Sequence, residues 1–160
     1  MGKMPITLKG LNRLRQELHK LITVDRVKVA QAIGEAIKIG DLKENAEYHV
    51  NKELQGLIEA KIRLLESQVS NALIIDISKI VEVDKVVFGA TVRLMNLSDQ
   101  QAVSYKIVGE YEADIQSAKI SITSPVAKAL IGKEIDDIVK VQAPSGIIEY
   151  QIIDIQYVDD

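Results

Sequence analysis

The sequence predicts an α+β protein in which a long antiparallel hairpin of two helices precedes a β-sheet domain. Apolar residues recur at spacings of three and four between Leu11 and Ile33, and again between Leu54 and Ala72, as they do along one face of a helix. After Asp76, short runs rich in β-branched residues take over, and such residues favour strands. The change of pattern therefore separates a helical part from a sheet.

The first helix is expected to begin after Thr7, whose hydroxyl suits an N-cap, while Pro5 keeps the preceding residues extended. Two helices of about 32 residues, rising about 1.5 Å per residue, would form a rod roughly 48 Å long that projects from the rest of the chain. Each helix carries an apolar stripe that can face the other. The first stripe comprises Leu11, Leu14, Leu18, Leu21 and, more loosely, Val27, Ala30 and Ile33; the second comprises Leu54, Ile58, Ile62, Leu65, Val69 and Ala72.

The bend between the helices is expected at Gly40 and Asp41. Glycine can end the first helix, and Asp41 can cap the second, with Glu44 three residues on completing a variant capping box. The same spacing places two carboxylates on one exposed tip, where they can share a divalent cation. Mg²⁺ commonly takes only one or two carboxylates from a protein. Helix capping and cation binding explain the spacing equally well.

The second half of the chain is expected to be mainly sheet. Ser145 and Gly146 indicate a tight hairpin turn, and Ser124 followed by Pro125 indicates the capped start of a short helix. We expect a hairpin domain over residues 1–76, with its acidic tip near 40–48, and a second domain over residues 77–160. The strands are expected within Val87–Leu97, Ala102–Val108, Ile138–Val141 and Ile147–Val158.

The composition excludes several classes of protein. The 160 residues are 47% hydrophobic and 27% charged, which is typical of folded domains and argues against disorder. Cysteine is absent and there are two histidines, so disulfides, thiolate metal sites and histidine metal clusters are not expected. The apolar runs are far shorter than the roughly 20 residues of a membrane span, and the N-terminus lacks a signal-peptide core. We expect a cytoplasmic protein.

The bend also carries a resemblance to a known family. Its ten residues, Gly40–His49, are similar to the tip signature of the Gre family of bacterial transcript cleavage factors. Further segments resemble the C-terminal domain of that family, namely Phe88–Val92, Tyr105–Gly109 and Ser124–Lys133. The resemblance extends from about Ile6 to Tyr157. It implies an N-terminal coiled coil followed by a C-terminal domain with an FKBP-like fold, in which an antiparallel sheet accompanies a short helix.

The resemblance implies a function and the residues that carry it. Such a factor acts as a monomer that enters the secondary channel of RNA polymerase and reaches the 3′ end of the nascent RNA there. It is not itself an enzyme, but stimulates the polymerase's own cleavage of backtracked RNA. Asp41 and Glu44 would be the catalytic pair, holding Mg²⁺ in a site that the polymerase completes. Ser124 and Pro125 match a segment implicated in docking on the polymerase.

Further residues near the tip are candidates for contact with RNA. Lys38, Lys43 and Lys52 can neutralise RNA phosphates, although each could equally be an ordinary solvated lysine of a helix. Tyr48 could stack on a base or pack against the first helix. Lys38 itself lies between two isoleucines, Ile37 and Ile39, where members of the resembled family carry basic and polar residues.

Three other functions compete with transcript cleavage. The first is a regulator that enters the same channel without aiding cleavage, and the Asp41 and Glu44 pair argues against it. The second is a prolyl isomerase, suggested only by the implied fold, and fold alone does not fix activity. The third is a coiled-coil dimerisation module, which would leave the residues of the tip unexplained.

Overall fold

The structure is a computed structural model, and it describes residues 3–41, 45–80 and 84–158. The chain divides into two compact units. Asn12–Asn71 form what we call the hairpin unit, and Met1–Leu11 together with Ala72–Asp160 form what we call the sheet unit. Long helices dominate the first and strands the second, which confirms the predicted α+β class.

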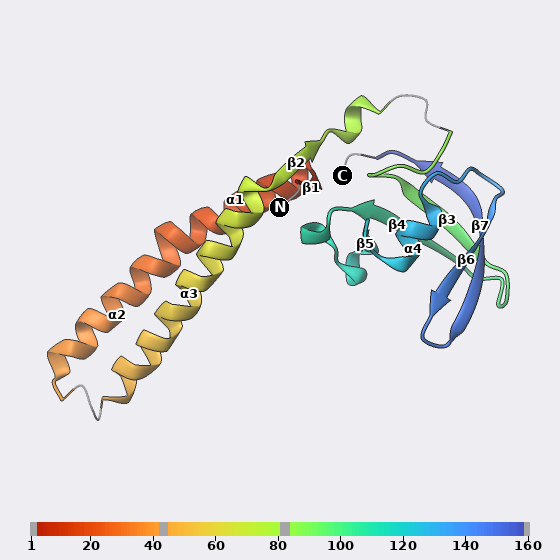
Figure 1. Ribbon diagram of the computed structural model, residues 1–160. Coiled ribbons are helices and arrows are strands. Elements are labelled where there is room, and N and C mark those ends of the chain that lie inside the picture. The colour runs from red at the N-terminus through yellow and green to blue at the C-terminus, as the bar shows by residue number, and fades with distance from the viewer. Residues whose placement is uncertain (1–2, 42–44, 81–83, 159–160) are drawn as a thin grey trace. The chain divides into compact units, whose positions relative to one another are not determined.

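The hairpin is built from two helical arms that run side by side in opposite directions (Figure 1). The first arm consists of α1 (Leu8–Lys20), a π-helical turn η1 (Leu21–Asp25) and α2 (Arg26–Ile39), which follow one another without a break. The second arm is α3 (Ala46–Ser70), which has 25 residues. It is shorter than expected because it begins only at Ala46, and because the chain leaves the helix after Ser70 and enters a strand.

The core of the hairpin confirms part of the predicted apolar stripes. Val29 and Ile33 of α2 pack with Ile58 and Ile62 of α3, and all four are buried. Val29 was not in the predicted stripe, whereas Val27 was, and Val27 is 45% exposed. Side chains four residues apart share a helix face, so Val29 lies one turn from Ile33 on the same side, while Val27 faces away. Ala30 and Leu54 are likewise exposed rather than buried.

A small parallel pair of strands joins the two ends of the hairpin. Strand β1 (Met4–Thr7) pairs with β2 (Ala72–Ile75), with Met4 opposite Ala72 and Thr7 opposite Ile75. Neither strand was expected, since Pro5 indicated only an extended lead-in and Ala72 seemed to continue the helical stripe. The expected division at residues 76 and 77 is a single cut in the chain, whereas the first eleven residues belong spatially with the second half.

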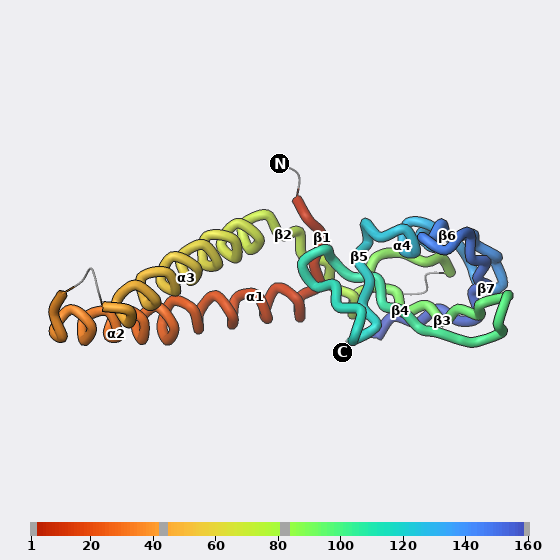
Figure 2. The backbone as a smooth tube through the Cα atoms, turned by 90° about the horizontal axis from the view of Figure 1, so that it is seen from below, coloured from red at the N-terminus to blue at the C-terminus, as the bar shows by residue number. Residues whose placement is uncertain are grey.

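The sheet unit is centred on five strands in the order β5-β4-β3-β7-β6. Neighbours are antiparallel except for β5, which runs parallel to β4. Figure 2 shows the helix α4 (Pro125–Leu130) lying beside this sheet. The strands are β3 (Thr91–Asn96), β4 (Ala102–Val108), β5 (Lys119–Ser121), β6 (Ile138–Ala143) and β7 (Gly146–Gln156).

Four of these five strands lie within or close to the predicted runs, and only the three-residue β5 was not anticipated. Ala143 pairs with Gly146, so the predicted hairpin turn exists but is centred on Pro144 and Ser145, one residue earlier than expected. The core between the sheet and α4 is apolar. It comprises Val86, Ala90, Val92, Leu94, Ile107, Ile120, Ala127, Leu130, Val139, Val141 and Ile152.

Candidate functional site

The end of the hairpin is formed by a sharp change of backbone direction at Gly40. The residue caps α2, and its N–H donates to the carbonyl of Ile37 at 3.2 Å. Its φ of 94° and ψ of −174° lie in a region essentially open to glycine alone. The next residue, Asp41, has a φ of 30° and is exposed. The predicted glycine end of the first helix is confirmed, and it leaves the Asp41 carboxylate open to solvent.

The predicted capping role of Asp41 is wrong. Helix α3 begins at Ala46, and its N-cap is Asn45, whose Oδ1 accepts a hydrogen bond from the N–H of Tyr48 at 3.2 Å. An N-cap side chain must reach the N–H two or three residues beyond it, and Asp41 stands too early in the chain to do so. Glu44 and Lys43, the other predicted residues of the bend, lie outside the described residues.

Asn45 also reaches back to the other helix. Its Nδ2 donates to the carbonyl of Ala36 at 2.7 Å and lies 3.4 Å from the carbonyl oxygen of Gly40. One side chain therefore connects the start of α3 with the end of α2. Sequence reasoning missed this residue, although a signal was present, because asparagine is among the preferred N-cap residues. Asp41 has the same preference, so residue type alone does not decide between the two.

The other predicted tip residues differ in their surroundings. Lys38, in the last turn of α2, is exposed. Lys52 is exposed as well, and its Nζ lies 3.3 Å from Oε1 of Gln55. Tyr48 is half-buried and packs against the hairpin core, while its ring meets that of His49 edge-on at 5.4 Å between centroids. Packing of Tyr48 is thus seen, and contact of these residues with RNA stays a prediction.

The predicted docking residues lie in the sheet unit. Ser124 caps α4, and its Oγ accepts a hydrogen bond from the N–H of Ala127 at 3.2 Å. Pro125 is the first residue of that helix and is exposed. The predicted capped helix is confirmed. A role of these two residues in binding another molecule stays a prediction.

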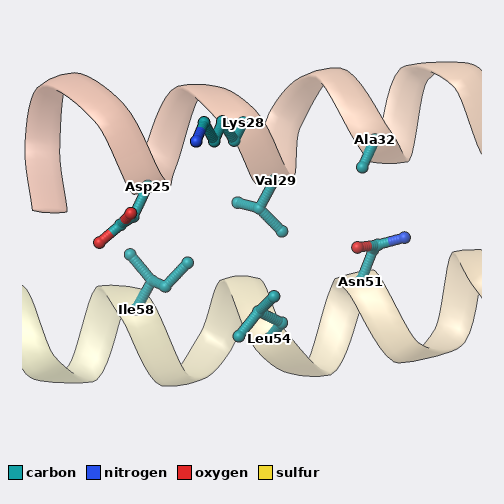
Figure 3. Close-up of a pocket in the computed structure, with 7 residues that line it drawn as sticks. All are labelled: Asp25, Lys28, Val29, Ala32, Asn51, Leu54 and Ile58. Carbon is teal, nitrogen blue, oxygen red and sulfur yellow. The ribbon is translucent and has the colours of Figure 1, made fainter.

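A groove between the two arms of the hairpin was not predicted. It has a volume of about 410 Å³. Figure 3 shows Val29 and Ala32 turned toward α3, with Leu54 and Ile58 turned toward α2. Asp25, Lys28 and Asn51 complete the lining. The groove is mainly apolar, and the few polar side chains that line it form no recognisable catalytic set. We therefore interpret it as a consequence of how the two arms pack and not as a catalytic site.

Among the predicted cation ligands of the tip, the structure describes one carboxylate, that of Asp41. In the described part of the chain, no three His, Asp or Glu side chains gather closely enough to hold a metal ion. Asp41 offers an exposed carboxylate, which is the type of ligand that Mg²⁺ prefers, and Mg²⁺ usually keeps several positions for water and phosphate. Asp41 is thus chemically suited to contribute one ligand to such a cation, and binding of Mg²⁺ at the tip stays a prediction. None of the described helices has the length and hydropathy needed to cross a membrane.

Comparison with known proteins matches nearly the whole chain to one family. Residues 4–74 match the family model described as "Transcription elongation factor, N-terminal", and residues 81–157 match "Transcription elongation factor, GreA/GreB, C-term". The transcription elongation factor GreA of Nitrosococcus oceani is 55% identical over 98% of this chain and 99% of its own length. GreA of Pseudomonas syringae pv. tomato is 49% identical over 99% and 100%, respectively.

A comparison with solved structures also gives a match. The crystal structure of GreA factor homolog 1 of Thermus thermophilus is 26% identical, with a TM-score of 0.44, and the match covers 96% of this chain and 99% of that one. The two family models together, and each of the two curated relatives by itself, cover nearly all of the sequence. The chain belongs to the GreA/GreB family of transcription elongation factors.

Proposed function

We propose that this protein stimulates RNA polymerase to cleave backtracked RNA, and that the end of its helical hairpin enters the polymerase's secondary channel to do so. The observation that carries the proposal is the exposed carboxylate of Asp41, set at the point where two long antiparallel helices meet. A carboxylate carried on a narrow hairpin can reach a site inside a larger molecule. A carboxylate that had no partner to reach would gain nothing from standing at the end of a hairpin.

The carboxylates of Asp41 and Glu44 act as ligands to a Mg²⁺ ion that the polymerase holds only in part. When bound there, Mg²⁺ supplies Lewis-acid activation of the water that attacks the phosphodiester bond. The side chains of this protein supply negative charge and hold the ion's position. Such a partial site binds the cation weakly by itself, since one or two carboxylates leave most positions of Mg²⁺ to other ligands.

The remaining predicted residues have supporting roles in the same complex. Lys38, Lys43 and Lys52 neutralise phosphates of the RNA, an interaction that depends on charge more than on detailed geometry. Tyr48 is half-buried, so it contributes mainly by holding the two helices together beneath the tip. Ser124 and Pro125 contact the polymerase from the sheet unit. The protein acts as a monomer in the cytoplasm, where the polymerase works.

A cleavage assay on stalled elongation complexes tests this proposal. Backtracked complexes with labelled RNA release a short 3′ fragment when the parent protein and Mg²⁺ are present, and the Asp41→Ala and Glu44→Ala variants release little. Both variants still bind the polymerase, because the substitutions leave the sheet unit untouched. Glu53→Ala is the matched control, since Glu53 is an exposed carboxylate further along α3.

Two results would contradict the proposal. If Asp41→Ala and Glu44→Ala both cleave as well as the parent, the carboxylates are not the functional groups. If the parent binds the polymerase and slows elongation but releases no RNA, the protein is a channel-binding regulator that does not support cleavage.

A further inference from the structure

The geometry points to Asn45 as a positioning residue that holds Asp41 in place at the end of the hairpin. This inference rests on the function proposed above, because it concerns how the carboxylate of that site is presented. Asn45 would act through Asp41 and would not itself touch RNA or a cation. Neither the family match nor the sequence pattern assigns it this role.

The side chain of Asn45 uses both its acceptor and its donor. Oδ1 accepts from the N–H of Tyr48 in the first turn of α3, at 3.2 Å. Nδ2 donates to the carbonyl of Ala36 at 2.7 Å and approaches that of Gly40 at 3.4 Å. An asparagine amide has one oxygen acceptor and two N–H donors, so these contacts occupy its whole polar end. The two helices are thereby connected across the bend.

Of the two carbonyls that Asn45 binds, that of Ala36 lies in the last turn of α2 and that of Gly40 directly before Asp41. Ala36 is buried in the last turns of α2, with 1% of its surface exposed, so its carbonyl is a fixed anchor. Gly40 and Asp41 both have positive φ values, 94° and 30°. Glycine adopts a positive φ readily, but in Asp41 such a value persists only where the surrounding structure holds it, and the contacts of Asn45 with Ala36 and Gly40 provide this restraint.

Asn45 also fixes the other end of the same connection. The chain leaves α2 at Gly40, passes through Asp41 and enters α3 directly after Asn45. Asp41 therefore directly follows a residue whose carbonyl lies beside the Asn45 side chain. A carboxylate that helps to bind a cation in another molecule must be held in a fixed position, since small displacements of a reacting group greatly reduce rates.

Helix capping alone is the simpler explanation of Asn45, and one substitution separates the two roles. Serine is as good an N-cap as asparagine, but its side chain is shorter and has no amide N–H to donate to the Ala36 carbonyl. Asn45→Ser therefore keeps the start of α3 and removes the link to α2. Asn51→Ser is the matched control, because Asn51 also donates its Nδ2 to a backbone carbonyl, that of Glu47 at 2.8 Å, within α3 itself.

The test combines amide hydrogen exchange of the free protein with the Mg²⁺ dependence of RNA cleavage. In Asn45→Ser we expect the Tyr48 amide to stay protected, because the cap is kept, while the Gly40 amide exchanges faster. We expect the Mg²⁺ concentration for half-maximal cleavage to rise about 10- to 100-fold, the usual effect of removing a residue that orients a metal ligand. Binding to the polymerase and the thermal unfolding of the hairpin should match those of Asn51→Ser.

The outcomes distinguish this inference from the proposed function. If Asn45→Ser matches the parent in both exchange at Gly40 and Mg²⁺ dependence, Asn45 is only a helix cap and the inference is wrong, while loss of cleavage in Asp41→Ala would leave the proposed function intact. If the parent itself stimulates no cleavage, the proposed function fails. Unchanged exchange at Gly40 would then also overturn the positioning role, and faster exchange there would support it.

Discussion

The carboxylate of Glu112 holds Thr7 with both of its oxygens. Oε2 accepts a hydrogen bond from the N–H of Thr7 at 3.0 Å, and Oε1 accepts one from its hydroxyl. Oε2 also accepts from the N–H of Gly109 at 2.8 Å, and the Thr7 hydroxyl oxygen accepts from the N–H of Gly10 at 3.0 Å. The first turn of α1 is therefore capped by Thr7, as predicted, and Thr7 is held in turn by Glu112.

Replacing Glu112 should destabilise the sheet unit. Glu112→Gln removes the charge and one of the two acceptor oxygens, and hydrogen bonds to charged groups contribute about 1.5–3 kcal/mol each. We expect the free energy of unfolding, measured by chemical denaturation, to fall by about 1–3 kcal/mol. Glu110→Gln is the control, because Glu110 lies with Glu112 in one short 3-10 helix, η3 (Glu110–Glu112), and is exposed. Equal stability of the two variants would show that the contact with Thr7 contributes nothing.

A methyl group at Gly10 should disturb the same contact. A Cβ built on Gly10 collides with the Glu112 side chain, so Gly10→Ala should push that carboxylate away from Thr7. Because both substitutions break one set of hydrogen bonds, their effects on the free energy of unfolding should not add. A double-mutant cycle with Glu112→Gln measures this coupling, and strict additivity would contradict the contact.

Gly40 and Gly34 should respond in opposite directions to alanine. A Cβ on either residue meets nothing within 4 Å, so only the backbone decides. Gly34 lies within α2, where alanine is favoured by about 0.5–1 kcal/mol. Gly40 has a φ of 94°, and alanine there should cost about 1–3 kcal/mol in stability. Denaturant unfolding checks both, and a stabilised Gly40→Ala variant would refute the need for glycine at the bend.

An ion pair between the arms of the hairpin gives a pH dependence of known sign. Arg26 donates to both carboxylate oxygens of Glu59, at 2.8 and 2.9 Å. The hydrogen bonds from Arg26 lower the pKa of Glu59. Its contribution to stability is therefore full above the unfolded-state pKa of glutamate, about 4.3, and is lost as the pH falls through the lower value of the folded state.

We expect Glu59→Gln to lower the thermal midpoint at neutral pH by a small amount, since the two side chains are 41% and 36% exposed and water screens them. The difference from the parent should shrink as the pH falls below about 4.3. Glu53→Gln, a change at an exposed position of the same helix, controls for the loss of a charge. A difference that grows in acid would reverse the sign and contradict the assignment.

The sequence predicted the helices well because their apolar period is local information. Ile58 and Ile62 lie four residues apart in α3, and together with Ile33 of α2 they belong to the hairpin core. Strands β1 and β2 were missed because their pairing, Met4 with Ala72, joins residues far apart in the chain. Four residues with no alternating pattern give no local sign of such a partner.

The candidate site was predicted in part for a similar reason. The glycine bend and the exposed Asp41 follow from residue types alone. The choice between Asp41 and Asn45 as N-cap does not, because both residues favour that position. What decides it is the carbonyl of Ala36, which Asn45 meets across the bend, and no local pattern contains that contact.

The pairing of β1 with β2 holds together the ends of the two helical arms that are opposite the bend. The two strands, Met4–Thr7 and Ala72–Ile75, have four residues each. Neither strand can form the hydrogen bonds of this pair without the other. A fragment made to study the arms in isolation should therefore run from Met4 to Ile75. Trimming it to the helical residues would leave both arms free to fray from the end opposite Asp41.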